Sequence, residues 1–156
     1  MLAAGEASRF GSPKQRLFLP DVLEALADSA VGDVVVVTGA HEVETEARVV
    51  RCPEWELGPG ASLRCGLRAL DADAVVIVLA DGPRLDPRAV DRVIDAWRQG
   101  VGDRLAATYD GVNRSHPVLL ARSVWGDVPD AGARELDVSL VPCEDLAAPG
   151  DVDYSY

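Results

Sequence analysis

Runs of apolar residues without alternation recur along this chain and are separated by amphipathic stretches. Residues 34–37 and 74–80 contain no polar side chain, which is typical of strands covered on both faces of a sheet. Residues 87–99 instead carry apolar side chains at the i, i+3, i+4, i+7 spacing of a helix that buries one side. Strands of the first kind joined by such helices predict a single α/β domain of three layers, with a mostly parallel, Rossmann-like sheet and crossover helices.

Shorter signals predict the remaining elements. Pro20 and Asp21 open a helix that Gly32 ends, because Asp is a favoured N-cap and Gly is favoured just past a helix. Ser62 is expected to cap a further helix in the same way. Additional strands are expected at residues 2–4, 49–52, 105–109, 116–120 and 140–143. The first of these is a stub, so we expect a truncated first strand.

Composition narrows the function. With 156 residues, of which 48% are hydrophobic and 26% charged, the chain has the balance of one globular domain spanning residues 1–156. Its formal net charge of −11 argues against a nucleic-acid partner, because a polyanion is bound by a basic surface. No apolar run approaches the roughly 20 residues of a membrane helix, so we expect no membrane association and a cytoplasmic location. The three cysteines lack C-x-x-C spacing, and we expect them to be reduced and buried.

Candidate chemistry is concentrated at the start of the chain. Gly5 and Gly11 punctuate a loop whose backbone N–H groups can gather on one concave side, because glycine has no Cβ to obstruct them. Arg9 and Lys14 add positive charge, and Lys14 is the only lysine of the chain. The spacing fits neither a P-loop nor the G-x-G-x-x-G fingerprint. The loop is therefore predicted to bind phosphate in another way, the alternative being a solvated surface loop.

The stretch from Leu2 to Lys14 reads L-A-A-G-x-x-x-R-x-G-x-P-K. It resembles the molybdenum-cofactor nucleotidyltransferases, the MobA-like NTP transferase family. The resemblance implies a fold of the nucleotide-diphospho-sugar transferase type and catalytic roles for Arg9 and Lys14, which would neutralise a triphosphate. The nucleotide-binding residues that it implies are Leu2, Ala3, Ala4, Gly5, Gly11, Lys14 and Ser62. For Ser62, which lies in a second motif resembling W-x-x-G-x-x-x-S-L-x-x-G-L, a simple N-cap is the alternative.

Asp81 directly follows the apolar run at residues 74–80. A carboxylate just past the end of a central parallel strand faces the crevice where open α/β sheets bind ligands. The run continues as L-A-D-G-P, which resembles the family's L-A-D-x-P turn and implies that Asp81 is a Mg²⁺ ligand, although Gly82 stands where glutamine is common. The alternative role for Asp81 is a helix cap.

Two further segments resemble family elements. Asp151 and Asp153 correspond to a D-x-D pair, which implies a second metal ligand, preferably Asp153, although the family's terminal helix is missing and a solvated tail is the alternative. His116 lies in S-H-P-V-L, similar to the family's G-H-P-V-L, and is a candidate for binding substrate; a histidine that only fixes a turn is the alternative. Arg134 ends a G-A-R loop and is a candidate contact for an anionic substrate, or a plain surface arginine.

The resemblance implies a Mg²⁺-dependent transfer of NMP from an NTP to a phosphorylated acceptor, with release of pyrophosphate. In this family the L-A-A-G form goes with cytidine and L-A-G-G with guanosine, so the resemblance implies CTP; a methyl group at Ala4 would crowd the larger purine. Molybdopterin is the implied acceptor and a molybdoenzyme the possible recipient of the product. Two alternatives stay open. They are transfer to a sugar phosphate or phospholactate, and a protein that binds nucleotide without turnover.

Overall fold

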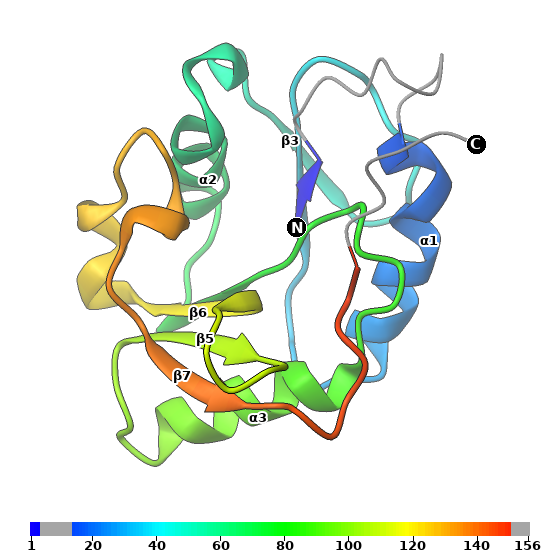
Figure 1. Cartoon of the computed structure of the whole chain (residues 1–156). Helices are drawn as coiled ribbons and strands as arrows, with labels where there is room; N and C mark the ends of the chain where they lie inside the picture. The colour runs from blue at the N-terminus through cyan, green and yellow to red at the C-terminus, as the bar shows by residue number, and fades with distance from the viewer. Residues whose placement is uncertain (4–13, 151–156) are drawn as a thin grey trace.

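The strands form one continuous mixed sheet in the computed structural model, which describes residues 1–3 and 14–150 (Figure 1). Their bounds are β1 (Leu2–Ala3), β2 (Val35–Thr38), β3 (Arg48–Arg51), β4 (Ala74–Ile77), β5 (Arg104–Thr108), β6 (Ser115–Ala121) and β7 (Ser139–Pro142). Two hydrogen-bonded groups, β1-β2-β3 and β4-β6-β5-β7, meet where the N–H of Leu2 donates to the carbonyl of Val78 (2.9 Å) and the N–H of Ala80 donates to that of Leu2 (3.0 Å). The order is therefore β3-β2-β1-β4-β6-β5-β7, and among the described strands only β6 runs antiparallel to its neighbours.

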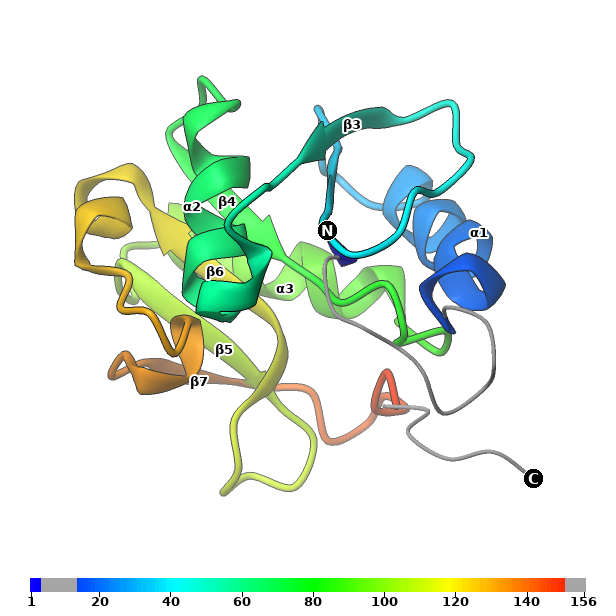
Figure 2. The same cartoon turned by 90° about the horizontal axis from the view of Figure 1, so that it is seen from above.

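Helices cover both faces of this sheet, which gives a single α/β domain of three layers (Figure 2). The α-helices are α1 (Lys14–Ala27), α2 (Pro59–Arg68) and α3 (Pro87–Arg98), and the short 3-10 helices are η2 (Trp55–Leu57), η3 (Arg122–Asp127) and η4 (Ala133–Glu135). Successive residues of a strand point to opposite faces. Leu105 of β5 accordingly packs in the core cluster with α1 and α3, whereas Ala106 packs in the cluster with α2.

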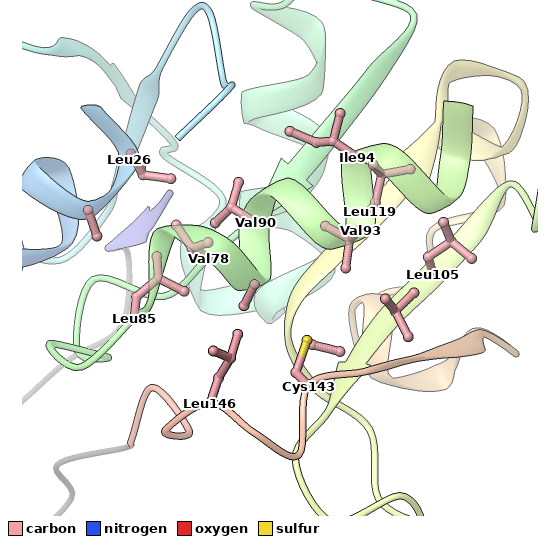
Figure 3. Close-up of a cluster of buried hydrophobic side chains, with 14 of the residues drawn as sticks. Leu26, Val78, Leu85, Val90, Val93, Ile94, Leu105, Leu119, Cys143 and Leu146 are labelled. Carbon is pink, nitrogen blue, oxygen red and sulfur yellow. The ribbon is translucent and has the colours of Figure 1, made fainter. Parts of the chain in front are cut away.

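The larger of these clusters lies between α3, α1 and the sheet (Figure 3). Val90 and Val93 of α3 are fully buried there against Leu119 of β6. The helix begins as its sequence predicts, because Asp86 is the N-cap and accepts a hydrogen bond from the N–H of Arg88 at 2.9 Å. The strands predicted at residues 34–37 and 74–80 are found as β2, which is buried throughout, and as β4 with the bridging residues that follow it; the first three residues of β4 are only half-buried.

Two predicted helix starts are wrong. α1 begins at Lys14 and contains Pro20, so Asp21 lies inside the helix and caps nothing. The buried stripe of this helix includes Leu19, before the proline, and its burial against the sheet outweighs the hydrogen bond that Pro20 removes. Ser62 lies inside α2, where Gly58 is the N-cap and Pro59 occupies the first turn.

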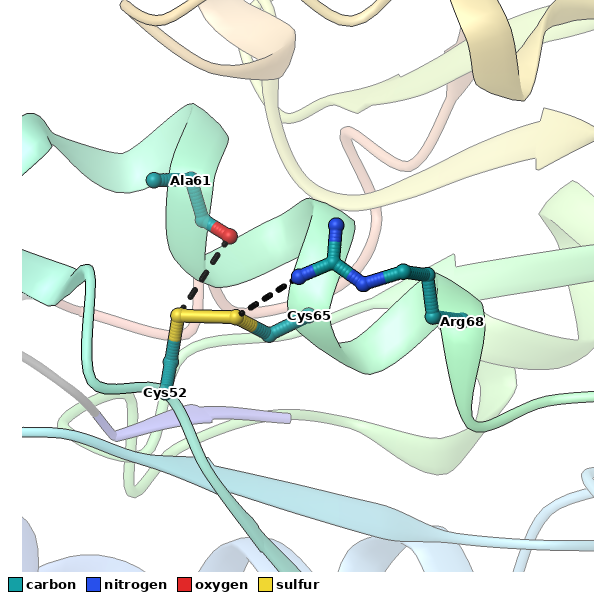
Figure 4. The surroundings of a disulfide bond; sticks show 4 residues. All are labelled: Cys52, Ala61, Cys65 and Arg68. Carbon is teal, nitrogen blue, oxygen red and sulfur yellow. Dashed lines mark hydrogen bonds between the residues drawn. A yellow bond between two sulfur atoms is a disulfide. The ribbon is translucent and has the colours of Figure 1, made fainter.

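The prediction that all cysteines are reduced is wrong for two of them. Cys52, just after β3, and Cys65 of α2 form a disulfide with a Cα–Cα distance of 5.8 Å (Figure 4). The carbonyl O of Ala61 lies 3.6 Å from Sγ of Cys52, and a guanidinium N–H of Arg68 points to Sγ of Cys65 at 3.4 Å. Both cysteines are buried, and the bond ties α2 to the strand it covers. Cys143 is free and buried, as expected.

The start of α2 packs directly on the backbone of residues 129–130. The N–H of Gly60 donates to the carbonyl of Asp130 at 2.9 Å, and a β-carbon added at Gly60 would lie 1.9 Å from the carbonyl oxygen of Pro129. We expect Gly60→Ala to lower the free energy of unfolding by about 3 kcal/mol, because backbone must shift to admit the methyl group. Urea unfolding measures this. Gly32→Ala is the control, because nothing lies within 4 Å of its added carbon, and equal stability of the two variants would contradict the packing described.

Candidate active site

Several segments of the chain meet at the edge of the sheet where the parallel strands end. β1 and the extended segment after β4 run side by side to this edge, and the antiparallel β6 begins at it. Open α/β sheets bind ligands at this edge, just outside the carboxyl ends of their strands. The loop at residues 4–13, with the candidates Ala4, Gly5, Arg9 and Gly11, follows β1 in the sequence but lies outside the described residues.

Asp81 lies in the turn after β4, where it is half-buried. The N–H of Gly82 donates to the carbonyl of Leu79 at 3.2 Å and closes this turn. Asp81 does not cap α3, since Asp86 does so, and its predicted place at the carboxyl end of a central strand is confirmed. Within residues 1–3 and 14–150, no three or more His, Cys, Asp and Glu side chains are grouped to hold a metal ion.

The segment at residues 149–150 packs against the turn that contains Asp81. The N–H of Arg84 donates to the carbonyl of Pro149 at 3.0 Å, and the two segments run side by side in Figure 1. A β-carbon added at Gly82 would lie 3.3 Å from both the carbonyl oxygen of Gly150 and Cβ of Pro149. Glycine at position 82 thus permits this close approach. Asp151, which follows Gly150 in the sequence, and Asp153 lie outside the described residues.

A cavity of about 430 Å³ lies beside the turn. Its lining comes from the end of β4, the start of β6, η4 and the returning chain end. The residues of these segments that line it include Leu79, Gly82, Arg114, His116, Arg134 and Gly150. The structure therefore brings together the candidate substrate contacts His116 and Arg134, which are separated in the sequence, next to the segment that carries Asp81.

His116 lies near the start of β6, and its carbonyl accepts a hydrogen bond from the hydroxyl of Tyr109 at 2.7 Å. Burial lowers the pKa of its imidazole to about 4; the Asp81 carboxylate opposes this shift and the Arg114 guanidinium adds to it. The ring is therefore neutral at pH 7. It can donate or accept a hydrogen bond in the cavity, but it supplies no positive charge to a phosphate group.

Other candidates lie elsewhere. Leu2 and Ala3 form β1, and Lys14 is the first residue of α1, at the end of the helix where the dipole favours an anion. Ser62 is 3% exposed within α2 and does not line the 430 Å³ cavity. Sequence reasoning missed Arg114, whose contacts with η4 join residues about twenty positions apart; its place just before the S-H-P-V-L element is the one signal that could have drawn attention to it.

The three-layer fold, with a carboxylate after its central strand, is an α/β fold that this chain shares with solved nucleotidyltransferase structures. A family model described as the MobA-like NTP transferase domain matches residues 1–140. The chain belongs to this family, and through it to the nucleotidyltransferases. No curated protein matches the chain significantly. None of the helices in the described part has the length and apolar character needed to cross a membrane.

Solved structures share the fold. Rv0371c from Mycobacterium tuberculosis H37Rv has a TM-score of 0.77 and 23% identity, and the match covers 98% of this chain and 90% of that chain. Its complex with manganese has a TM-score of 0.67 and 19% identity, and the match covers 91% of this chain and 84% of that chain. Molybdopterin-guanine dinucleotide biosynthesis protein A from Archaeoglobus fulgidus has 0.65 and 18%, covering 92% and 82%. CMP:2-keto-3-deoxy-manno-octonic acid synthetase complexed with CTP has 0.72 and 14%, covering 98% and 91%.

Proposed function

We propose that this chain transfers CMP from CTP to the phosphate group of molybdopterin, releasing pyrophosphate and using Mg²⁺. The observation that carries the proposal is the position of Asp81, which lies past the central strand, next to a cavity lined by His116 and Arg134. The product would be passed to a molybdoenzyme. The proposed location is the cytoplasm, where a disulfide such as Cys52–Cys65 is uncommon.

Three similar structures support separate parts of this proposal. One of them is a complex with manganese, a divalent ion that takes the same oxygen ligands as Mg²⁺. Another is complexed with CTP, in line with the choice of base suggested by Ala4. A third is named for the biosynthesis of molybdopterin-guanine dinucleotide; its base differs from the proposed cytosine, but its name favours molybdopterin as acceptor over a sugar phosphate or phospholactate.

The donor set fits a hard divalent cation. Asp81 offers carboxylate oxygens, the ligands Mg²⁺ prefers, and Asp153 or Asp151 would complete the site after the returning segment at Gly150. Bound there, the ion would supply charge stabilisation to the phosphate oxygens of the triphosphate. We assign to Asp81 the role of holding it.

The other residues would act by positioning and by fixed charge. Arg9 and Lys14 would neutralise the triphosphate, while Leu2, Ala3, Ala4, Gly5 and Gly11 would supply the backbone against which it lies. Ser62 would contact the base. His116, neutral at pH 7, would orient the acceptor by a hydrogen bond. The attacking phosphate oxygen of the acceptor is already anionic, so no side chain needs to remove a proton from it.

A pyrophosphate-release screen tests the proposal. CTP, GTP, ATP and UTP are each combined with molybdopterin and with a panel of sugar phosphates and phospholactate, in the presence of Mg²⁺. We expect the fastest release with CTP and molybdopterin, and none after chelation of the metal. Release only with another phosphorylated acceptor would overturn the choice of molybdopterin. Nucleotide binding without release in any combination would identify a binding protein instead.

A further inference from the structure

Arg114 makes a set of hydrogen bonds that its position before His116 does not require. Its guanidinium donates to the carbonyl oxygens of Ala133 (2.8 Å), Arg134 (3.4 Å) and Leu136. All three acceptors belong to η4 or to the residue after it. One side chain just before β6 thus holds a turn that lies about twenty residues further along the chain.

The turn has few hydrogen bonds of its own, although Ala133 and Leu136 also pack against the core cluster that contains Leu63 and Leu67 of α2. η4 is three residues long, and its N-cap Gly132 has a φ of 91° and supplies no side-chain hydrogen bond. Its own backbone bonds are those from Glu135 to Gly132 (3.2 Å) and from Leu136 to Ala133 (3.0 Å). The fork of N–H donors on an arginine can satisfy several carbonyls at once, which the point charge of a lysine does less well.

The contacts of Arg114 are hydrogen bonds to backbone carbonyls and not an ion pair. No ion pair among the described residues involves it, and its guanidinium is half-buried. Burial lowers the pKa of Arg114, an effect that the nearby Asp137 opposes, but an arginine stays charged in a protein. Moving this charge out of water and against backbone carbonyls costs free energy. The hydrogen bonds between Arg114 and the turn must offset that cost.

Arg134 belongs to this turn and lies at the cavity. Arg134 is exposed and lines the cavity with His116 and Gly150. The guanidinium of Arg84 packs on Gly150, 2.6 Å from the position that a β-carbon of residue 150 would take, but Arg84 does not itself line the cavity. Among the described residues that line the cavity, the side chains with a permanent positive charge are Arg114 and Arg134, and an arginine can bind a phosphate group through two parallel hydrogen bonds.

We propose that Arg114 is a positioning residue for the acceptor: it fixes the turn at residues 133–136 so that Arg134 points its guanidinium at the acceptor's phosphomonoester in the cavity. Arg134 touches the substrate, and Arg114 acts only through the turn. This inference rests on the proposed nucleotidyl transfer and names the residue that binds the anionic group of its acceptor. It does not involve the nucleotide, which the loop after β1 would hold.

Steady-state pyrophosphate release by the full chain tests the inference, with molybdopterin or, failing that, the sugar phosphate that supports the fastest release in the screen. We expect Arg134→Ala to raise KM for the acceptor about tenfold or more, because a charge-assisted contact is lost, with KM for the nucleotide unchanged. Arg114→Lys should raise the same KM. In a chain that already carries Arg134→Ala, Arg114→Lys should raise KM for the acceptor little further, because both changes act through one contact.

Arg122→Lys is the matched control. Arg122 also donates to a backbone carbonyl, that of Ala72 (3.4 Å), and to Asp71 (2.7 Å), but away from the cavity. It should leave KM for the acceptor unchanged. Arg134 is exposed, so its variant keeps the test valid if Arg114→Lys fails to fold.

The outcomes separate the two proposals. An active wild-type chain whose KM for the acceptor is unchanged in Arg134→Ala overturns the role of Arg134 and leaves the proposed function standing. A loss of stability and kcat in Arg114→Lys, with an unchanged acceptor KM, reduces Arg114 to a structural residue and overturns the inference. A wild-type chain that releases no pyrophosphate with any pair overturns both.

Discussion

Asp81→Asn is expected to lower pyrophosphate release by about a thousandfold. An asparagine keeps the size of the side chain and one oxygen, but it removes the negative charge that would hold a divalent cation against the triphosphate. Loss of one preorganised electrostatic contact at a developing charge commonly lowers kcat by about two to three orders of magnitude. The fold should survive, since Asp81 is only half-buried and lies in a turn rather than in the core.

The measurement is the initial rate at saturating CTP and acceptor over a range of Mg²⁺ concentrations. Asp95→Asn is the control, because it removes the same charge from an exposed position on α3, and it should match the wild-type rate. If Asp81→Asn retains a tenth or more of the wild-type rate with an unchanged requirement for metal, Asp81 is not the ligand.

Lys14→Ala is expected to reduce pyrophosphate release by about a hundredfold or more, because it removes a charge-assisted contact to the triphosphate that strengthens in the transition state. Lys14 is the only lysine and the first residue of α1, where the helix dipole also favours an anion.

The rate of pyrophosphate release in three variants separates a specific contact from a general effect of charge. The variants are Lys14→Ala, Lys14→Arg and Arg98→Ala. Arg98 is exposed in the last turn of α3, and its variant should behave as the wild type. Lys14→Arg keeps the charge and should fall between the other two, because a planar fork replaces a compact ammonium. Wild-type turnover in Lys14→Ala would remove this residue from the mechanism.

The sequence predicts those elements whose local pattern and burial agree. The run at residues 74–80 and the helix capped by Asp86 appear as expected, because a single segment carries the whole signal. The predicted start of α1 is too late, because Pro20 reads as a helix start and only the packing of Leu19 against the sheet shows that the helix begins earlier. The Cys52–Cys65 bond depends on how α2 docks on β3, which no spacing reveals.

The candidate site divides in the same way. Asp81 could be found from the strand that ends before it, because in α/β proteins the position after a central strand determines the location of the ligand site. The neutrality of His116 and the link from Arg114 to η4 could not be found, because they depend on burial and on contacts between β6 and a distant turn. For Ser62 the sequence is misleading. Its residue type suggests that it caps α2, whereas Gly58 is the N-cap of that helix.

The central claim is transfer of a nucleotide, and its most direct test is to follow the α-phosphate. The wild-type chain is incubated with CTP labelled at the α-phosphate, molybdopterin and Mg²⁺, and the products are separated. We predict that the label moves to molybdopterin in equal amount to the pyrophosphate released, and that chelation of the metal stops both. Label found in free CMP, or CTP that stays unchanged, would contradict the account.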